Sequence, residues 1–585
     1  MANSFGSLYI GKSGLQSSLN ALNTTSNNLA NIDTEGYVRQ QTRFADAGYT
    51  TFNSTAAISK QQAGLGVTIS DVIHARDVFL DKSYRAESGR QAFYAASYDA
   101  CNEVYTYYQE LQGQAFQEGL NDLWVAFQEF AKDPAESTNQ NLVVQKAGLF
   151  LSRTQAVYTG LQNYQLNINT QISDDIEEIN ELGKTIYQLN LEIQKTEAGG
   201  IETAMTLRDE RDKALDQLSA LANISYKETG DGFVKVSLEG QEFIDESKCY
   251  EIGKKVDKLT GFITPYWPQL SDTEHDKYVE VYDYSVEIAS EKNTNIGEVK
   301  ALLLARGERI ADYRDIEGVD YDTYNQSTRT SVATGNSVML TAQAELDKLF
   351  HAIATGVNDL LCPNKTLDAD VTFTTKAGDT VTLAAGTKIL DAENCDTGAD
   401  GTLPPQELFC RVGTERYTKY EADDGTVYYV YNEEDLTDKS KMYTIDATNI
   451  NEALQELSSR LPHLKQDATD TEKASIDYDL GEKLASIWEN SKITLNPNDT
   501  GSYSFAKYYA AMIGEMATLG SVYDTTATSL SGTVTSVDNQ RQQVMGTSSD
   551  EELTNMIKYQ NAYNANSRFI NVINEMIEIL LTQLG

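Results

Sequence analysis

The side chains that most often carry chemistry in proteins are scattered along this sequence. None of the four histidines falls in an H-E-x-x-H pattern or beside a cysteine, so their spacing predicts no metal site. We expect these imidazoles to have ordinary surface or helix-end roles. They are His74, His275, His351 and His463.

The five cysteines are odd in number, and no two of them form a C-x-x-C pair. This spacing argues against both a zinc site and a disulfide scaffold. We expect buried or tolerated thiols, because a free cysteine often behaves as a small hydrophobic residue. The alternative is a disulfide between Cys395 and Cys410; the other cysteines are Cys101, Cys249 and Cys362.

Motifs for nucleotide binding and nucleophilic catalysis are missing as well. Gly64-Leu65-Gly66 lacks the third glycine and the helix of a dinucleotide fingerprint, so it indicates a turn. The sequence has no P-loop and no G-x-S-x-G. Acidic clusters such as the one at 174–178 are most simply solvated helix faces in so acidic a chain. We therefore predict no catalytic residue, no cofactor and no enzymatic activity.

Length and charge narrow the class of protein. A chain of 585 residues, 40% of them hydrophobic, is expected to form several packed domains. Its net charge of -40 disfavours nucleic acid and an anionic membrane as partners. No apolar run approaches the roughly 18 residues of a membrane span. The N-terminal segment also lacks the features of a signal peptide. We predict no membrane insertion, and any secretion must use an uncleaved route.

The two ends of the chain are nearly neutral and contain no proline. Near the start, a leucine recurs every seven residues, at Leu8, Leu15, Leu22 and Leu29. Near the end, two interleaved series have the same period: Met556, Tyr563, Ile570 and Ile577, and Tyr559, Asn566, Ile573 and Leu580. Because this period is typical of a coiled coil, we expect the terminal helices to bury their seams against each other. The alternative is two separate surface helices.

Between the ends, helical spacing predicts helices over 86–132, 141–195 and 203–222. Asp133-Pro134 ends the first and Gly199-Gly200 the second. The second would extend about 80 Å at roughly 1.5 Å per residue, so this part should be a rod.

Short alternating segments broken by glycine predict hairpins over 224–292 and 366–445. In the second region the turns are expected at Gly378-Asp379 and at Asp424-Gly425. Helical spacing returns over 297–361, and again after about 450 as far as the C-terminus.

These elements predict an α+β fold: an elongated, mainly α-helical rod with paired terminal helices and strand-rich inserted domains. We expect four domains. They are a terminal coiled-coil assembly domain (1–45 and 536–585), a long-helix bundle (46–223, 297–361 and 466–535), a strand-rich domain (224–296) and a variable strand-rich insertion (362–465).

The segment 21–39 resembles the N-terminal signature shared by flagellar rod, hook and hook-associated proteins. Small polar side chains in it permit close approach of helices, and a glycine permits the turn that ends the helix. The tail segment 559–568 looks like the matching C-terminal signature. The family pattern S-x-N-x-A-N-x-x-T-x-G-Y falls on Ser26, Asn28, Ala30, Asn31, Thr34, Gly36 and Tyr37, with Arg39 in the usual basic position.

Two internal segments point, within this family, to a hook-associated protein of the junction type. They are 207–218 (LRDERDKALDQL) and 538–544 (DNQRQQV). The resemblance covers both ends and much of the helical middle, whereas 365–465 matches nothing in it. It implies an extracellular structural subunit of the bacterial flagellum that joins the hook to the filament. It also implies type III export without a cleaved signal.

The resemblance further implies several partners: other copies of the chain in a helical ring or array, the hook protein, a second junction protein on the filament side, and an export chaperone at the C-terminal helix. We expect the terminal helices to be poorly ordered in the free monomer and to gain order on assembly. The residues expected at the assembly interface are Leu8, Leu15, Leu22, Ser26, Asn28, Leu29, Asn31, Gly36, Tyr37, Arg39, Met556, Tyr559, Tyr563, Asn566, Arg568, Ile570, Ile573, Ile577 and Leu580.

The nearest alternative is another axial subunit, such as a hook or distal rod protein, because it shares the terminal signatures. A cytoplasmic coiled-coil scaffold and an enzyme carried on the insertions are more distant alternatives, and the residues expected of the enzyme are missing.

Overall fold

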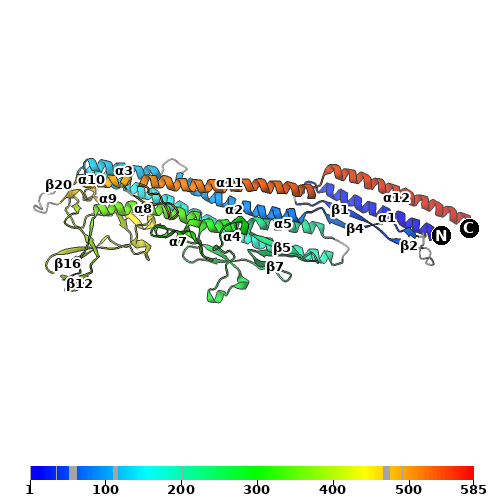
Figure 1. Cartoon of the computed structure of the whole chain (residues 1–585), viewed down its shortest axis with the longest axis horizontal. Coiled ribbons are helices and arrows are strands. Elements are labelled where there is room, and N and C mark those ends of the chain that lie inside the picture. The colour runs from blue at the N-terminus through cyan, green and yellow to red at the C-terminus, as the bar shows by residue number, and fades with distance from the viewer. Residues whose placement is uncertain are drawn as a thin grey trace.

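The computed structural model describes residues 2–34, 36–51, 62–109, 116–199, 203–465, 475–490 and 492–584. They form an elongated rod with both ends of the chain at the same pole (Figure 1). Long helices run along the rod, and small sheets lie on its side and at the opposite pole. The predicted α+β rod is confirmed.

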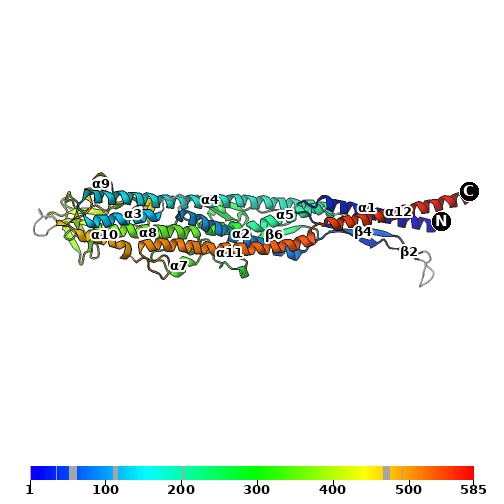
Figure 2. The ribbon, with the colours of Figure 1, turned by 90° about the horizontal axis from the view of Figure 1, so that it is seen from above.

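The thin end of the rod, called the stem below, contains the two terminal helices. α1 (Ala2–Ala30) and α12 (Ser549–Leu584) lie side by side in both perpendicular views (Figures 1 and 2). A hairpin packs along α1, with β1 (Gln40–Asp46) antiparallel to β4 (Val67–His74). Its outer part pairs β2 (Tyr49–Thr51) with β3 (Gln62–Gly64). The predicted pairing of the terminal helices is confirmed.

The thicker part of the rod, called the body below, is a bundle of long helices. α2 (Val78–Gln109) runs antiparallel to α11 (Phe505–Met545), since Tyr509 donates a hydrogen bond to the carbonyl of Tyr108 near one end of the pair while Asp81 meets Arg541 near the other. The helix α4 (Ser137–Glu197) has 61 residues, which corresponds to about 90 Å. α5 (Met205–Leu221) packs beside it.

The helix expected over 86–132 is confirmed on either side of an interval that lies outside the described residues. The structure has α2 and then α3 (Phe116–Lys132), and residues 110–115 between them lie outside the described residues. The predicted stop before Asp133-Pro134 is confirmed, as are the helices expected over 141–195 and 203–222.

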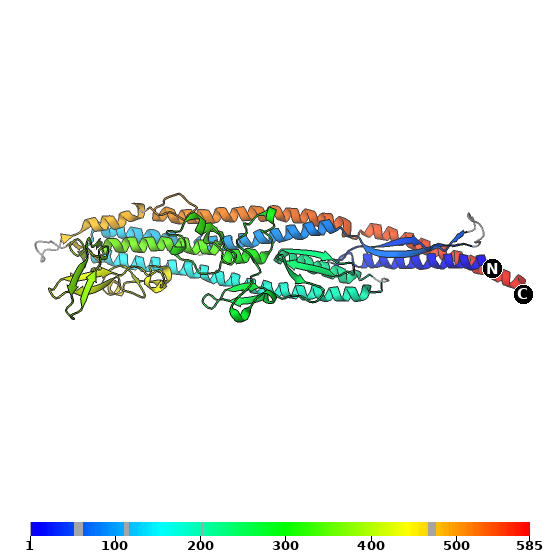
Figure 3. The ribbon, with the colours of Figure 1, turned by 60° about the horizontal axis from the view of Figure 1, so that its bottom comes forward.

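A strand-rich block follows α5, as the sequence predicts, and Figure 3 shows it lying against α4 and α5. On α4, the side chain of Asn190 pairs with the backbone N–H and carbonyl of Val234, so the block is tied to the body. The strands form a three-stranded antiparallel sheet of β5 (Ile224–Glu228), β6 (Val234–Leu238) and β7 (Gln241–Ile244), and a hairpin of β8 (Gly253–Val256) and β9 (Ile263–Tyr266).

The helical spacing expected over 297–361 holds only at the two ends of that range. α6 (Glu298–Arg306) ends at Gly307, which has a φ of 67° and so favours glycine. Residues 307–337 then form turns, short 3-10 segments and α7 (Tyr321–Asn325). α8 (Val338–Leu361) passes through the centre of the body and is buried on all sides over its first half.

The insertion at the pole opposite the stem contains the two predicted hairpins. β11 (Val371–Thr374) pairs with β12 (Thr380–Leu383), and β16 (Tyr417–Glu421) pairs with β17 (Val427–Tyr431). Gly378 and Gly425 have positive φ in the turns, as those turns require. The remaining strands of the insertion are β10 (Asn364–Thr366), β13 (Lys388–Leu390), β14 (Asp396–Thr397), β15 (Phe409–Arg411), β18 (Thr448–Ile450), β19 (Leu464–Lys465) and β20 (Ser475–Ile476).

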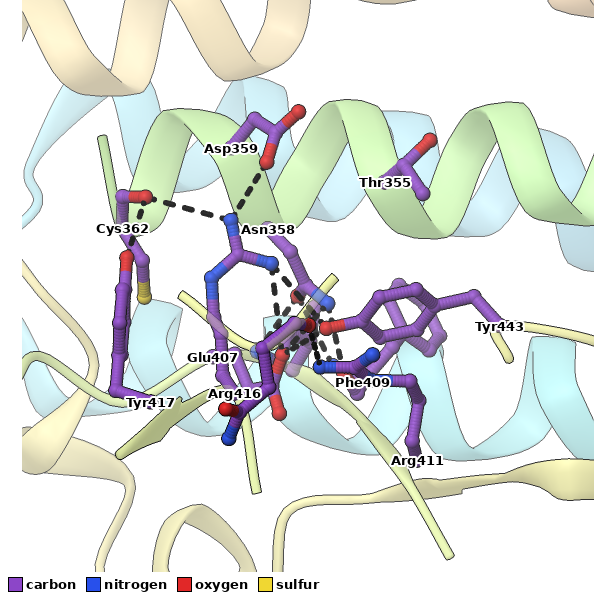
Figure 4. A network of polar contacts seen from close by, with 12 residues as sticks. Thr355, Asn358, Asp359, Cys362, Glu407, Phe409, Arg411, Arg416, Tyr417 and Tyr443 are labelled. Carbon is purple, nitrogen blue, oxygen red and sulfur yellow. Dashed lines mark hydrogen bonds and ion pairs between the residues drawn. The ribbon is translucent and has the colours of Figure 1, made fainter. Parts of the chain in front are cut away.

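Figure 4 shows how the insertion is anchored to the end of α8. Asn358 accepts hydrogen bonds from the backbone of Leu408 and Phe409 and donates one to the carbonyl of Phe409. The buried guanidinium of Arg416 reaches Asp359, with 2.6 Å between Nη2 and Oδ1. These contacts join the insertion to the body, and one connected cluster of buried apolar side chains spans both. The four-domain division stays a prediction.

The continuous helical spacing expected after about 450 is wrong before residue 478. The described residues of that stretch form the short α9 (Glu452–Glu456), a 3-10 segment (Ser458–Arg460) and the strands β19 and β20, and α10 (Tyr478–Asn490) begins beyond them. α10 and α11 are separated by the turns of 492–504. From α11 onward the predicted helical run is confirmed.

All five cysteines are free thiols, so Cys395 and Cys410 form no disulfide. Among the described residues, no helix is long and apolar enough to cross a membrane. Within those same ranges, no three His, Cys, Asp or Glu side chains gather as a metal site would require.

Candidate assembly site: the stem and the joint at its base

The face of α12 that meets α1 is the one marked by the two heptad series. Ile573 is buried, and the other members of the two series are half-buried except Leu580, which is 46% exposed. Along the helix this face begins at Glu552, a buried carboxylate in the first turn. The heptad period of the C-terminal sequence therefore predicts the contact face correctly.

The face of α1 that meets α12 differs from the prediction. Its buried positions are small or polar and follow the same alternating spacing of three and four residues: Gly11, Gly14, Ser18, Ala21, Thr25 and Asn28. Opposite them, a Cβ placed on Gly11 would lie 2.8 Å from Cγ1 of Ile570, and one on Gly14 would lie 2.7 Å from Oδ1 of Asn566. Small residues thus let the two helices approach closely, as they do at other tight helix contacts.

The leucines at 8, 15, 22 and 29 are half-buried and flank this seam. The expectation that they form the buried seam with the C-terminal helix is wrong. On α1 each leucine lies beside the small-residue seam. A leucine within the seam would hold the two helices apart. The leucines are therefore left partly open to solvent at the edge of the helix pair.

A second apolar stripe is exposed on α12 next to the seam. Its members precede the seam positions by one residue and follow the same spacing: Phe569, Val572, Met576 and Ile579. All four are more than a third exposed. The ring of Phe569 touches α1 at Gly11, but the described residues leave most of the stripe uncovered, so α12 presents apolar surface beside the half-buried leucines of α1.

Three residues of the N-terminal signature meet at the base of the stem. The side chain of Asn28 pairs with the backbone N–H and carbonyl of Gln40, and its Nδ2 donates to Oε2 of Glu552. The hydroxyl of Tyr37 donates to Oδ1 of Asn28 over 2.8 Å. Burial, with the charges of Asp209 and Glu552, raises the pKa of Tyr37 to about 12. Arg39 pairs with Glu551 and Glu552.

The other signature residues have local or exposed roles. The side chain of Asn31 donates to the carbonyl of Asn27 and accepts from the hydroxyl of Thr34, which closes the turn after α1. Gly36 has a φ of 83°, the left-handed conformation that glycine adopts without strain. Ser26 and Arg568 are exposed. These two side chains therefore take no part in the contact between α1 and α12.

Where the stem meets the body, arginine and aspartate side chains form a buried network, called the joint below. Arg541 on α11 pairs with Asp81 on α2 over 2.9 Å and with Asp216 on α5 over 2.8 Å. Arg85 bridges Asp212 and Asp216, at 3.1 and 2.6 Å. Asp216 therefore binds arginines from two helices, α2 and α11. A guanidinium fork is suited to such bridging contacts.

Arg76, which precedes α2, completes the joint by pairing with Asp81 over 2.6 Å and with Asp212. The burial of Asp212 is outweighed by the arginines around it, which hold the pKa of its carboxyl below the usual range. Next to the joint, Oδ2 of Asp209 accepts a hydrogen bond from the backbone of Val38, and Oδ1 lies 3.4 Å from His74. Burial and the charge of Arg76 lower the pKa of His74 to about 4, so this imidazole is neutral.

The joint brings together the two internal segments that the resemblance singles out. Asp209, Asp212 and Asp216 belong to 207–218, and Arg541 belongs to 538–544. Sequence reasoning missed Arg76, Asp81 and Arg85. No spacing marks these three residues, and only the fold brings them near α5. The sequence offered one indication of the joint, which is the arginine Arg541 within the polar segment 538–544.

Three family models match this chain. The model described as "Flagellar hook-associated protein FlgK helical domain" matches residues 101–371. The model described as "Flagella basal body rod protein" matches residues 8–37. The model described as "Flagellar basal body rod FlgEFG protein C-terminal" matches residues 540–584. The second range covers most of α1. The third covers the end of α11 and all of α12.

Curated relatives match over the full length. The chain is 24% identical to flagellar hook-associated protein 1 of Bacillus subtilis over 591 residues, which cover 100% of this chain and 99% of that protein. It is 23% identical to the protein of the same name from Salmonella typhimurium, over 97% of this chain and 98% of that protein. A solved structure, the flagellar hook junction protein FlgK from Burkholderia pseudomallei, covers 79% of this chain and 99% of that chain at 12% identity, with a TM-score of 0.48.

Proposed function

We propose that this chain, which belongs to the family of flagellar hook-associated protein 1, is a structural subunit of the flagellar axis that joins the hook to the filament. It is an exported part of the flagellum and assembles with other axial components. Its role is mechanical, and it carries out no chemical reaction.

The observation that carries this function is the stem. The two ends of the 585-residue chain pair at one pole, with an exposed apolar stripe on α12 and half-buried leucines on α1. Exposed apolar stripes of this length mark surfaces that another protein covers. A head-to-tail contact between stems builds an open helical array, because each copy offers one face and accepts another. The first partner is therefore a further copy of the chain.

A junction subunit meets a different protein at each end of its ring. The hook protein lies on one side and a second junction protein on the filament side. Before assembly, the stripe of Phe569, Val572, Met576 and Ile579 needs a cover, because an exposed apolar helix face invites aggregation. An export chaperone that holds α12 in a groove fits that need.

Deletion of the coding sequence tests this function. We expect cells with hooks but without filaments, and unpolymerised flagellin in the medium. Cells without any hook would instead indicate a hook or distal rod protein, and normal flagella would contradict an axial role altogether. Expression of the wild-type chain from a plasmid should restore the filaments and serves as the control.

A further inference from the structure

The passage from the body into the stem is a break between two long helices. α11 ends at Met545 and α12 begins at Ser549, so only residues 546–548 join them. The chain shifts course at this point, called the elbow below (Figure 1). A few non-helical residues between rigid elements act as a hinge unless other contacts hold the elements. The direction of the stem therefore depends on what spans the elbow.

Arg39 contacts both sides of the elbow. Its backbone N–H donates to the carbonyl of Met545, the last residue of α11, over 2.9 Å. Its Nε lies 2.9 Å from Oε1 of Glu552, and its Nη1 lies 2.7 Å from Oε2 of Glu551, both in the first turn of α12. The carbonyl of Arg39 accepts a hydrogen bond from Ala75 at the end of β4. One residue thus ties the end of α11, the start of α12 and the base of the hairpin.

The carboxylate of Glu552 gives this contact its strength. Its side chain is only 2% exposed, and each oxygen has one partner: Oε1 is held by Arg39 and Oε2 by Nδ2 of Asn28, 3.2 Å away. The N-terminal turn of a helix also favours a negative charge. Removing Arg39 would leave a buried carboxylate without its cation, which is far more costly than losing an exposed ion pair.

The other arm of the elbow is already fixed. Arg541, one turn before the end of α11, is held by Asp81 and Asp216 in the joint. α11 therefore cannot adjust to a change in α12, and any loosening at Arg39 appears as movement of the stem relative to the body. The joint holds one side of the elbow, and Arg39 holds the other.

We infer that Arg39 is a positioning residue that fixes the direction of α12 relative to α11, and so holds the stem at one angle to the body. The consequence for the flagellum rests on the proposed function. In a helical array every copy must present its stem at the same angle, because the contacts repeat from subunit to subunit. A stem that swings about the elbow would disturb each of these contacts.

Charge exchange at the elbow tests the inference. In cells that lack their own copy, we compare Arg39→Glu, the pair Glu551→Arg with Glu552→Arg, and the triple exchange. We expect Arg39→Glu and the glutamate pair each to lower filament number by about tenfold or more, since a buried charge then loses its partner. The triple exchange should recover part of the lost filaments, because it restores the ion pairs but places positive charge at the N-terminus of α12. Arg43→Glu, an exposed position on β1 just after Arg39 for which the described residues show no ion pair, is the matched control and should behave as wild type.

Two outcomes of this comparison would overturn the inference. If Arg39→Glu assembles normally, the contact does not hold the stem. If Arg39→Glu fails but the triple exchange recovers nothing, Arg39 acts on another subunit and not across the elbow. If the wild-type chain itself restores no filaments, the proposed function fails, and the next measurement then decides the inference alone.

Hydrogen exchange of the purified full chain tests the elbow without flagella. The inference predicts that 545–556 is protected in the free chain, in contrast to the disorder that the sequence alone leads us to expect for the terminal helices before assembly. Peptides covering 545–556 should exchange about tenfold faster in Arg39→Glu than in wild type, recover in the triple exchange, and stay unchanged in Arg43→Glu. Exchange in the body, measured over α4 and α8, should be equal in all variants, which shows that they fold. Complete exchange of 545–556 in the wild type at the first time point, or equal rates in wild type and Arg39→Glu, would overturn the inference.

Discussion

Replacing Arg541 by alanine removes the guanidinium that ties α11 to α2 and α5 at the joint. The side chain is 5% exposed, pairs with Asp81 and Asp216, and its guanidinium carbon lies 4.1 Å from the ring centre of Tyr84. Removing one partner of a buried ion pair costs about 3–5 kcal/mol, because the other charge is left buried. Here each aspartate keeps a second arginine, so we expect a loss at the lower end, about 3 kcal/mol.

The assay is urea unfolding of the purified chain, followed by a probe in α2 or α11. Arg541→Ala should unfold at a lower urea concentration with an unchanged slope, which reports lost stability and not a changed denatured state. The unfolding midpoint of Arg541→Lys should lie between those of wild type and Arg541→Ala, since lysine keeps the charge but cannot span both carboxylates. Arg43→Ala, exposed on β1, should stay within about 0.5 kcal/mol of wild type. An Arg541→Ala midpoint equal to wild type would refute the role assigned to the joint.

Two further predictions concern close packing and buried charge. Gly14→Ala places a Cβ 2.7 Å from the side-chain amide of Asn566. Hydrogen exchange in α1 and α12 of assembled flagella should therefore be faster in this variant. The double variant with Asn566→Ala should return to the wild-type exchange rate. Burial raises the pKa of Glu345 and Glu515, the first also through the charge of the second. The folded chain thus holds protons that the unfolded chain releases, and stability should fall as pH rises from about 5 to 8. In Glu515→Gln, the melting temperature should depend less on pH over this range and should exceed that of wild type at the alkaline end; an identical pH profile would count against the coupling.

Local sequence periodicity predicted much of the fold. The heptads of α12, the long stretch of α4 and the glycine turns at Gly378 and Gly425 are local patterns, and each was read correctly. The irregular run of 307–337 was missed, because tertiary contacts and turns there override a helical spacing that the sequence retains.

The contact face of α1 in the stem was not predicted by the hydrophobic pattern of the sequence. The leucines of α1 repeat every seven residues and so indicate a seam, yet the residues that face α12 are Gly11, Gly14 and other small side chains. Apolar periodicity finds bulky seams and overlooks small ones, which pack closely without adding hydrophobic side chains. The joint escaped prediction for another reason: its charges come from segments as distant as Asp81 and Arg541, and only the folded chain brings them together.

A cysteine cross-link in assembled flagella tests the paired stem most directly. Gly14→Cys and Asn566→Cys face each other across the seam, at the short separation that a disulfide needs. Gln16→Cys with Asn566→Cys, on the exposed side of α1, is the control. We predict an oxidised bond within one chain for the first pair, none for the control, and intact filaments. Cross-links between chains, or no bond in the first pair, would contradict the account.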